Sequence, residues 1–245
     1  MCPSLLLLEG VGGLEATLRV ERRRAIPQCC YGDEYDSLFT SKQAGRTASR
    51  FRRKGLKGSA QDIVEGIEAV ASSHSCVLEV GGGVGQIQVA LLETGVAVRT
   101  VNVELSSNWE DAAARLLTER NLEDRVQRVT GDFVDRAGSL PKADVVVLHR
   151  VICCYPHWKA LLEAAIATAG KVIALTFPRD VWWNRVGIGM GNLICRISRR
   201  SFRAYVHRPE PMIGLIEAAG FSIARDRPRR IWRTLVAARQ VGSGS

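Results

Sequence analysis

The sequence lacks the cysteine spacing of a zinc site or of a disulfide framework. Its 245 residues include seven cysteines, an odd number, and no two of them form a C-x-x-C motif. The adjacent pairs Cys29-Cys30 and Cys153-Cys154 are poorly placed for relaxed disulfides. We therefore expect a cytoplasmic protein without a metal site. We expect Cys153 and Cys154 to pack as small apolar side chains and not to act as nucleophiles.

Long hydrophobic runs are missing as well. The run nearest the start, Leu5–Leu8, has no basic residue before it. Such a run is shorter than the apolar core of a secretory signal and far shorter than the roughly 20 residues that span a bilayer. We expect neither a signal peptide nor a membrane-spanning helix, and we find no internal repeat.

Acidic residues are fewer than basic ones. There are 34 lysines and arginines against 25 aspartates and glutamates, a formal net charge of +9. Nucleic acid, an anionic membrane face, an acidic small substrate or a basic solvated surface without a partner each fit this balance. One segment contains six cations and no acid, and it is either a solvated helix face or an arm that offers cations to an acidic substrate: Arg46, Arg50, Arg52, Arg53, Lys54 and Lys57.

Short apolar runs alternate with segments of helical periodicity, which predicts an α/β fold with a Rossmann-like, doubly wound, mostly parallel sheet of seven strands. We expect a poorly ordered extension over 1–30 and a single domain over 31–240, with a helical arm at 31–58 and an insertion at 181–208. Ser59 with Asp62, and Ser107 with Glu110, have the spacing of capping boxes, and Asp36 or Ser37 is expected to cap a helix. The expected strands are 76–80, 98–104, 126–130, 143–149 and 171–177, followed by a hairpin of 221–227 and 231–239 with an antiparallel strand at the C-terminal edge.

The stretch from Cys76 to Gln88, CVLEVGGGVGQIQ, reads as strand, glycine turn and helix, the opening of a βαβ unit that approaches a ligand. A dinucleotide fingerprint requires a third glycine where this sequence has Gln86 or Gln88. A dinucleotide is therefore not the expected ligand.

The pattern E-x-G-x-G-x-G over Glu79–Gly85 resembles motif I of the class I S-adenosylmethionine-dependent methyltransferases. The resemblance extends from about Ser59 to Arg239, and it includes PEPMIGLIEAAGF near the C-terminus. It implies S-adenosyl-L-methionine as cofactor, with Glu79 holding the methionine amino group and Glu104 accepting hydrogen bonds from both ribose hydroxyls. It further implies that Asp132 reads the adenine amino group and that the next residue covers the ring. The full set of expected cofactor-binding residues is Glu79, Gly81, Gly82, Gly83, Gly85, Glu104, Leu105, Asp132, Phe133 and His149.

The methyl acceptor is expected beside the segment HRVICCYPHW, after the fourth strand. A general base is needed only if the acceptor must lose a proton. His149 and then Tyr155 are the catalytic candidates, with His157 third. VICCYP resembles the magnesium-protoporphyrin O-methyltransferases, although Cys154 stands where that family has histidine. The insertion is either an acceptor wall or lid or a packed helix-loop extension, and it also has the arginine-flanked apolar character of a membrane contact. The expected substrate residues are Tyr35, Arg150, Trp182 and His207.

The predicted function is S-adenosylmethionine-dependent methyl transfer to a small molecule that is aromatic, lipophilic or acidic. The Asn/Asp-Pro-Pro-Tyr motif of many nucleic acid amino-methyltransferases is absent, which argues against base methylation. Two alternatives stay open. One is an RNA methyltransferase that uses the basic arms around 46–57 and 225–239, and the other is a non-catalytic cofactor-binding subunit.

Overall fold

The computed structural model describes residues 35, 36 and 38–239, so the predicted extension at 1–30 lies outside the described part. Seven strands form one sheet in the order β3-β2-β1-β4-β5-β7-β6. All neighbouring pairs are parallel except those of β7, which runs antiparallel to β5 and to the edge strand β6. The predicted fold class is confirmed. The strands are β1 (Ser75–Val80), β2 (Ala97–Glu104), β3 (Val126–Thr130), β4 (Ala143–His149), β5 (Ala169–Pro178), β6 (Phe221–Pro228) and β7 (Trp232–Arg239).

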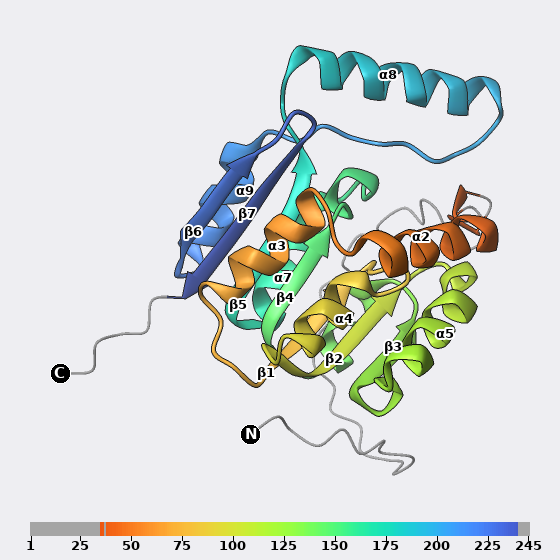
Figure 1. Ribbon diagram of the computed structural model, residues 1–245. Helices are drawn as coiled ribbons and strands as arrows, with labels where there is room; N and C mark the ends of the chain where they lie inside the picture. The colour runs from red at the N-terminus through yellow and green to blue at the C-terminus, as the bar shows by residue number, and fades with distance from the viewer. Residues whose placement is uncertain (1–34, 37, 240–245) are drawn as a thin grey trace, which may run out of the picture.

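Helices cover both faces of this sheet (Figure 1). One face carries α2 (Ser41–Lys54), α3 (Ser59–Glu68), α4 (Gln86–Glu93) and α5 (Glu110–Arg120). The other face carries α6 (Phe133–Arg136), α7 (Trp158–Thr168) and α9 (Pro209–Ala218). Because both faces are covered, the central strands are apolar on both sides: in β4, Val145 and Val147 pack in one core cluster, and Val146 and Leu148 pack in the other.

The helix caps predicted at Asp36, Ser59 and Ser107 are wrong, and the alternative cap at Ser37 lies outside the described residues. Helix α2 is capped by Thr40 in a capping box with Gln43, while Asp36 accepts hydrogen bonds from Ser106 and Ser107. Ser107 begins a short turn, η1 (Ser107–Trp109), and caps nothing. Glu110 is the first residue of α5.

Helix α3 also lacks a side-chain cap. Its N-cap residue is Gly58, and Ser59 is the first helical residue. The side chains of Ser59 and Asp62 instead bind partners that are distant in sequence: His149 at the end of β4, and Arg229 between β6 and β7. These distant hydrogen bonds replace local capping.

The insertion forms α8 (Trp182–Ile197) and a return segment over 198–208, which starts with a turn and contains no helix or strand. Helix α8 projects above the carboxyl ends of the strands, at the top of Figure 1. Asn184 anchors it, because its amide donates to the carbonyl oxygens of Arg179 (2.8 Å) and Ile231 (2.9 Å). No helix in the described part of the chain is long and apolar enough to cross a bilayer.

Candidate functional site

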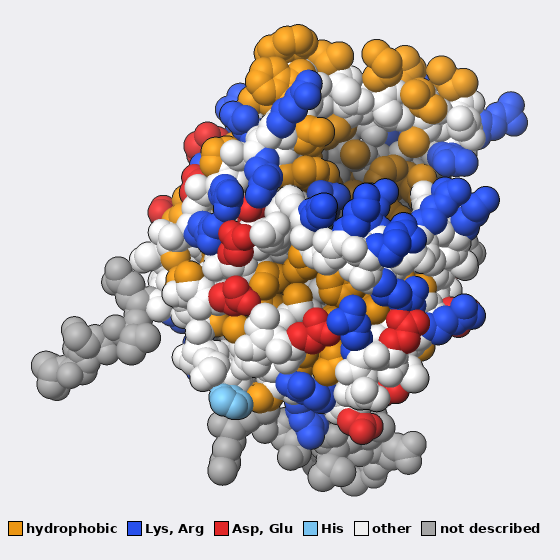
Figure 2. Space-filling view, in the orientation of Figure 1, with side chains coloured by type: hydrophobic (Ala, Val, Ile, Leu, Met, Phe, Trp, Pro, Cys, Tyr) orange, Lys and Arg blue, Asp and Glu red, His pale blue; other side chains and the backbone are white. Residues whose placement is uncertain are grey.

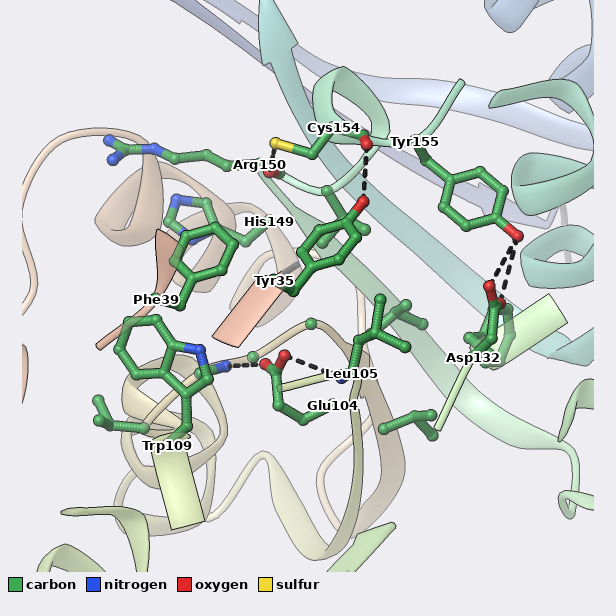
Figure 3. Close-up of a pocket in the computed structure, with 18 of the residues that line it drawn as sticks. Tyr35, Phe39, Glu104, Leu105, Trp109, Asp132, His149, Arg150, Cys154 and Tyr155 are labelled. Carbon is green, nitrogen blue, oxygen red and sulfur yellow. Dashed lines mark hydrogen bonds between the residues drawn. The ribbon is translucent and has the colours of Figure 1, made fainter. Parts of the chain in front are cut away.

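A cavity of about 310 Å³ lies at the carboxyl ends of β1, β2 and β4 (Figure 3). The direction of winding changes between β1 and β4, and ligands of open α/β sheets bind at such a switch point. Most predicted cofactor residues line the cavity, namely Gly81, Gly82, Gly83, Glu104, Leu105, Asp132, Phe133 and His149. Glu79 and Gly85 do not line it.

The glycine turn that closes one side of the cavity requires its glycines for two reasons. Gly81, Gly83 and Gly85 have φ values of 62°, 58° and 78°, which L side chains rarely adopt. At Gly82 the requirement is space, because a Cβ would lie 2.5 Å from Nδ2 of Asn102 and 2.6 Å from the carboxyl carbon of Glu79. Gly85 serves the turn into α4, since a Cβ there would meet the Gln88 side chain.

Beneath this turn, Glu79 and Asn102 form a buried polar pair. Both are fully buried, and Oε2 of Glu79 and both side-chain polar atoms of Asn102 have no hydrogen-bond partner among the described residues. Burial raises the pKa of Glu79 from 4.5 to about 8, although Gln88 and Arg128 act in the opposite direction. Unsatisfied buried polar atoms are costly, so this pair fits a site built for a polar, cationic group of a ligand.

Glu104 presents a fixed carboxylate to the cavity. Its Oε2 accepts the backbone N–H of Gly83 (2.8 Å), and its Oε1 accepts those of Leu105 (2.9 Å) and Ser106 (3.2 Å). Burial raises its pKa, against the effect of these hydrogen bonds. A carboxylate accepts several donors at once, which suits a vicinal diol. The predicted ribose-binding role of Glu104 therefore fits the geometry.

At the other end of the cavity, the side chains of Asp132 and Tyr155 are hydrogen-bonded to each other. The Tyr155 hydroxyl donates to both carboxylate oxygens of Asp132, at 3.2 and 3.0 Å, and Asp132 also accepts the N–H of Val134 (Figure 3). Burial and the Asp132 charge raise the pKa of Tyr155. Tyr155 is therefore held as a protonated donor, which disfavours it as a base.

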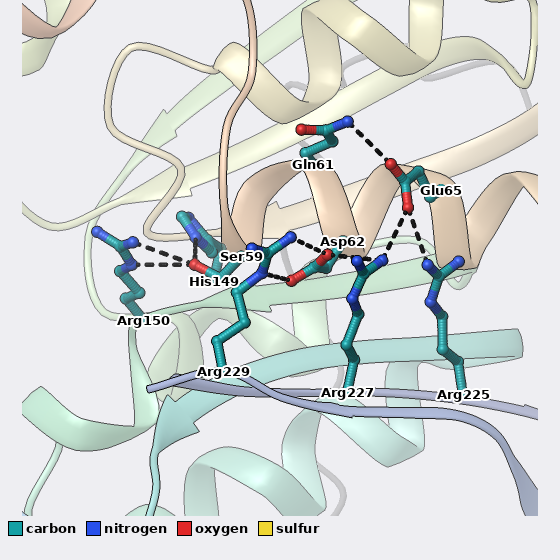
Figure 4. Close-up of polar contacts among 9 residues, drawn as sticks. All are labelled: Ser59, Gln61, Asp62, Glu65, His149, Arg150, Arg225, Arg227 and Arg229. Carbon is teal, nitrogen blue, oxygen red and sulfur yellow. Dashed lines mark hydrogen bonds and ion pairs between the residues drawn. The ribbon is translucent and has the colours of Figure 1, made fainter. Parts of the chain in front are cut away.

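His149 and Arg150 share one hydroxyl group, that of Ser59 (Figure 4). Arg150 donates to Ser59 Oγ from Nε (3.3 Å) and Nη2 (3.1 Å), and His149 Nε2 lies 3.1 Å from the same oxygen. Because a guanidinium only donates, the Ser59 proton is left for His149, which makes Nε2 an acceptor. Burial and the Arg150 charge lower the pKa of His149 to about 3. His149 is therefore a neutral imidazole and a weak base.

An aromatic wall completes the cavity, made by Tyr35, Phe39 and Trp109. The Tyr35 and Phe39 rings stack at 6.1 Å, and those of Phe39 and Trp109 lie 5.8 Å apart. Only Tyr35 was expected from the sequence. The i, i+4 spacing of Tyr35 and Phe39 was a readable signal, whereas the position of Trp109 depends on the turn after β2.

Two predicted substrate residues are not part of this cavity lining. Trp182 lies on the outer face of α8 with 72% of its surface exposed. His207 stacks on Tyr205, and its Nε2 lies 3.2 Å from the Ile152 carbonyl oxygen. The other two, Tyr35 and Arg150, line the cavity as expected.

Cys153 and Cys154 lie in the turn η4 (Ile152–Cys154), with their sulfur atoms 3.6 Å apart. Contact with Cys154 and burial raise the pKa of the Cys153 thiol well above its usual value. Cys153 is thus a buried thiol, as the packing interpretation requires. No cluster of potential metal ligands occurs in the described residues.

Comparison with known families gives a match to the O-methyltransferase domain, over residues 14–177. Comparison with curated proteins gives no match. Among solved structures, magnesium protoporphyrin IX methyltransferase from Synechocystis, with bound S-adenosylhomocysteine, has a TM-score of 0.60 at 20% identity, covering 84% of this chain and 93% of that one. An O-methyltransferase family 2 protein from Planctomyces limnophilus, in complex with apigenin, has a TM-score of 0.58 at 16% identity, covering 81% and 61%. These structural likenesses show a shared fold, whereas the family match covers most of the sequence. The chain therefore belongs to the O-methyltransferase domain family and is an S-adenosylmethionine-dependent methyltransferase.

Proposed function

We propose that the protein methylates an oxygen atom of a small-molecule acid that is already ionised when it binds, a carboxylate being the acceptor that fits best. This proposal rests on three residues at one cavity: Arg150, a cation that pairs with no carboxylate of the described residues, and the two weak base candidates His149 and Tyr155. S-adenosylmethionine supplies an electrophilic methyl group on a sulfonium centre, and the protein's residues bind, orient and exclude water.

The roles of the cofactor-binding residues are inferred from the match between their polar groups and the groups of S-adenosylmethionine. Glu104 would hold the ribose, Asp132 the adenine amino group, and Glu79 with Asn102 the cationic amino group of the methionine portion. The unpartnered oxygens, Oε2 of Glu79 and Oδ1 of Asn102, support the last assignment, because a bound ammonium group would donate hydrogen bonds to them.

Base catalysis is poorly supported at this cavity. The pKa of His149 is about 3, so an imidazolium formed there would be a much stronger acid than a phenol, and proton transfer to it would be uphill. The Tyr155 hydroxyl keeps its proton, which it donates in hydrogen bonds to the Asp132 carboxylate. A carboxylate needs neither residue, since it reaches the cavity without a proton at neutral pH.

Arg150 is the group that would attract such an acceptor. Its guanidinium stacks over Trp232 at 4.5 Å and pairs with no carboxylate of the described residues. Its backbone φ of 60° is uncommon for a residue with a side chain, and such conformations cluster at functional sites. Tyr35, Phe39 and Trp109 offer ring faces for the rest of the acceptor. The porphyrin and apigenin named for the structural neighbours are flat molecules of the kind that such a wall accommodates.

The RNA alternative is less well supported. Near the C-terminus, Arg225 and Arg227 pair with Glu65, and Arg229 pairs with Asp62 (Figure 4). Arg233, which that figure does not draw, pairs with Asp226. Three carboxylates of the protein itself offset most of the charge of these four arginines, so the arginines offer less to a phosphate backbone.

The test uses methyl-labelled S-adenosylmethionine and a panel of aromatic carboxylic acids and matched phenols. We expect base-labile methyl esters from the acids, and a loss of at least tenfold in kcat/KM for Arg150→Met that Arg150→Lys partly restores. S-adenosylhomocysteine binding, measured in parallel, should be unchanged in both variants. Labelling of phenols in preference to acids would overturn the proposal.

A further inference from the structure

Helix α8 presents a continuous hydrophobic face to solvent. Eight large hydrophobic side chains are exposed in the described chain, and seven of them belong to α8: Trp182, Trp183, Val186, Met190, Leu193, Ile194 and Ile197, with exposed fractions between 42% and 74%. At about 100° of rotation per residue, all seven fall within an arc of roughly 120°. In Figure 2 they form the hydrophobic crest at the top of the molecule.

The opposite side of α8 holds it to the protein. Asn184, Ile188, Asn192 and Cys195 are its less exposed residues and recur at helical spacing. Asn192 bonds to Ala204 of the return segment in both directions, at 2.8 Å. The hydrophobic stripe therefore points away from the core, and no described residue covers it. Monomeric proteins rarely leave a continuous apolar surface of this kind without a partner.

The charged side chains around this hydrophobic face are almost all basic. Residues 179–208 contain a single acid, Asp180, and Arg185 binds it with two hydrogen bonds of 2.5 and 2.8 Å. Four arginines at the C-terminal end of α8 and in the return segment pair with no carboxylate of the described residues: Arg196, Arg199, Arg200 and Arg203. An apolar helix face bordered by unpaired arginines is complementary to a bilayer surface with anionic headgroups.

The insertion also borders the cavity. Phe202 of the return segment meets the Tyr35 ring edge-on at 6.1 Å, and the Tyr205 N–H donates to the carbonyl oxygen of Cys153 at 2.7 Å. Figure 2 shows a hollow lined by hydrophobic side chains between α8 and the basic side chains over α2. A surface that docks on α8 would therefore lie on the side of the molecule where the cavity is found.

We propose that α8 is a membrane-docking helix, which binds the protein to an anionic lipid surface with its outer hydrophobic face. The helix lies in the headgroup region and does not cross the bilayer. This inference concerns a surface outside the catalytic cavity.

The test is co-sedimentation of the full chain with vesicles of phosphatidylcholine alone or with a quarter of phosphatidylglycerol. We expect binding to the anionic vesicles that is at least tenfold tighter than to the neutral ones. Met190→Glu with Ile194→Glu should reduce this binding at least tenfold. The control Gln127→Glu with Ser222→Glu, which adds the same charge at exposed positions on β3 and β6, should bind like the parent.

A second pair of variants tests the contribution of the arginines to binding of anionic vesicles. Arg199→Glu with Arg200→Glu should abolish the preference for anionic vesicles. Arg99→Glu with Lys142→Glu, which changes net charge equally at exposed sites away from α8, should retain it. Unchanged binding in the α8 variants would overturn the proposal. So would a dimer that dissociates on Met190→Glu with Ile194→Glu and shows no vesicle binding, because a second copy of the chain would then cover the face. S-adenosylhomocysteine binding by every variant separates these outcomes from any failure of the methyl-transfer assignment.

Discussion

Replacing Glu79 with glutamine should stabilise the ligand-free protein and weaken cofactor binding. Glu79 is fully buried, and its pKa is raised from 4.5 to about 8. Holding a carboxyl group in the fold then costs about 3 kcal/mol at pH 7, since each pKa unit corresponds to about 1.4 kcal/mol and pH 7 lies 2.5 units above the unfolded value. Glutamine has nearly the same shape, carries no ionisable group and can donate to the unpaired oxygen of Asn102.

The sign of the pH dependence follows from the raised pKa. The folded state keeps the Glu79 proton up to about pH 8, whereas the unfolded chain releases it near 4.5, so this contribution is greatest below 4.5 and is lost as pH rises to 8. Between pH 6.5 and 8 the advantage of Glu79→Gln over the parent should grow by about 2 kcal/mol. Urea denaturation at several pH values measures this difference.

Cofactor binding gives a second readout of the same group. If the cationic amino group of the ligand ionises Glu79, binding of S-adenosylhomocysteine at pH 7 should release about 0.9 proton, the fraction bound at a pKa near 8. Calorimetry in buffers of different ionisation enthalpy measures this number, and Glu79→Gln should release none. The reasoning is refuted if the parent releases no proton and the variant has the same pH slope of stability.

Three further changes test other parts of the structure. Gly82→Ala should weaken S-adenosylhomocysteine binding at least tenfold by calorimetry, because the new methyl group would collide with side chains under the turn, whereas Gly138→Ala meets open space and should be neutral. Asp62→Ala removes a fully buried carboxylate from Arg229 and should cost about 2 kcal/mol in urea denaturation, while Glu65→Ala, at a more exposed pair, should cost less than about 1 kcal/mol. In the folded protein His149 is unprotonated down to about pH 3, whereas the unfolded chain takes up this proton near pH 6.5. The free energy of unfolding should therefore decrease as the pH drops below 6.5, by about 2 kcal/mol at pH 5, and His149→Gln should remove that loss. Equal acid sensitivity of variant and parent would contradict this prediction.

The architecture was readable from the sequence because it depends on local patterns. The apolar run of β4 and the glycines after β1 are enough to place a parallel sheet with a ligand turn at its edge. The positions of Glu104 and Asp132 followed from the ends of β2 and β3, and the structure brings both to the same cavity.

The helix caps were not readable, because tertiary contacts overrode local spacing. Ser59 and Asp62 have the separation of a capping box, yet Ser59 binds His149 and Asp62 binds Arg229, which lies 167 residues away. The insertion was ambiguous for a related reason. Its helical periodicity was visible, but the side facing the protein depends on anchors such as Asn184.

The central claim is that the methylated oxygen is ionised before it enters the cavity and needs no base from the protein. The most direct measurement is the pH dependence of kcat with a carboxylic acid acceptor between pH 6 and 8.5, for the parent and for His149→Gln. The account predicts a flat profile and a base-labile ester product from both proteins. A rate that falls tenfold per unit of pH below 8, and that His149→Gln abolishes while S-adenosylhomocysteine still binds, would contradict it.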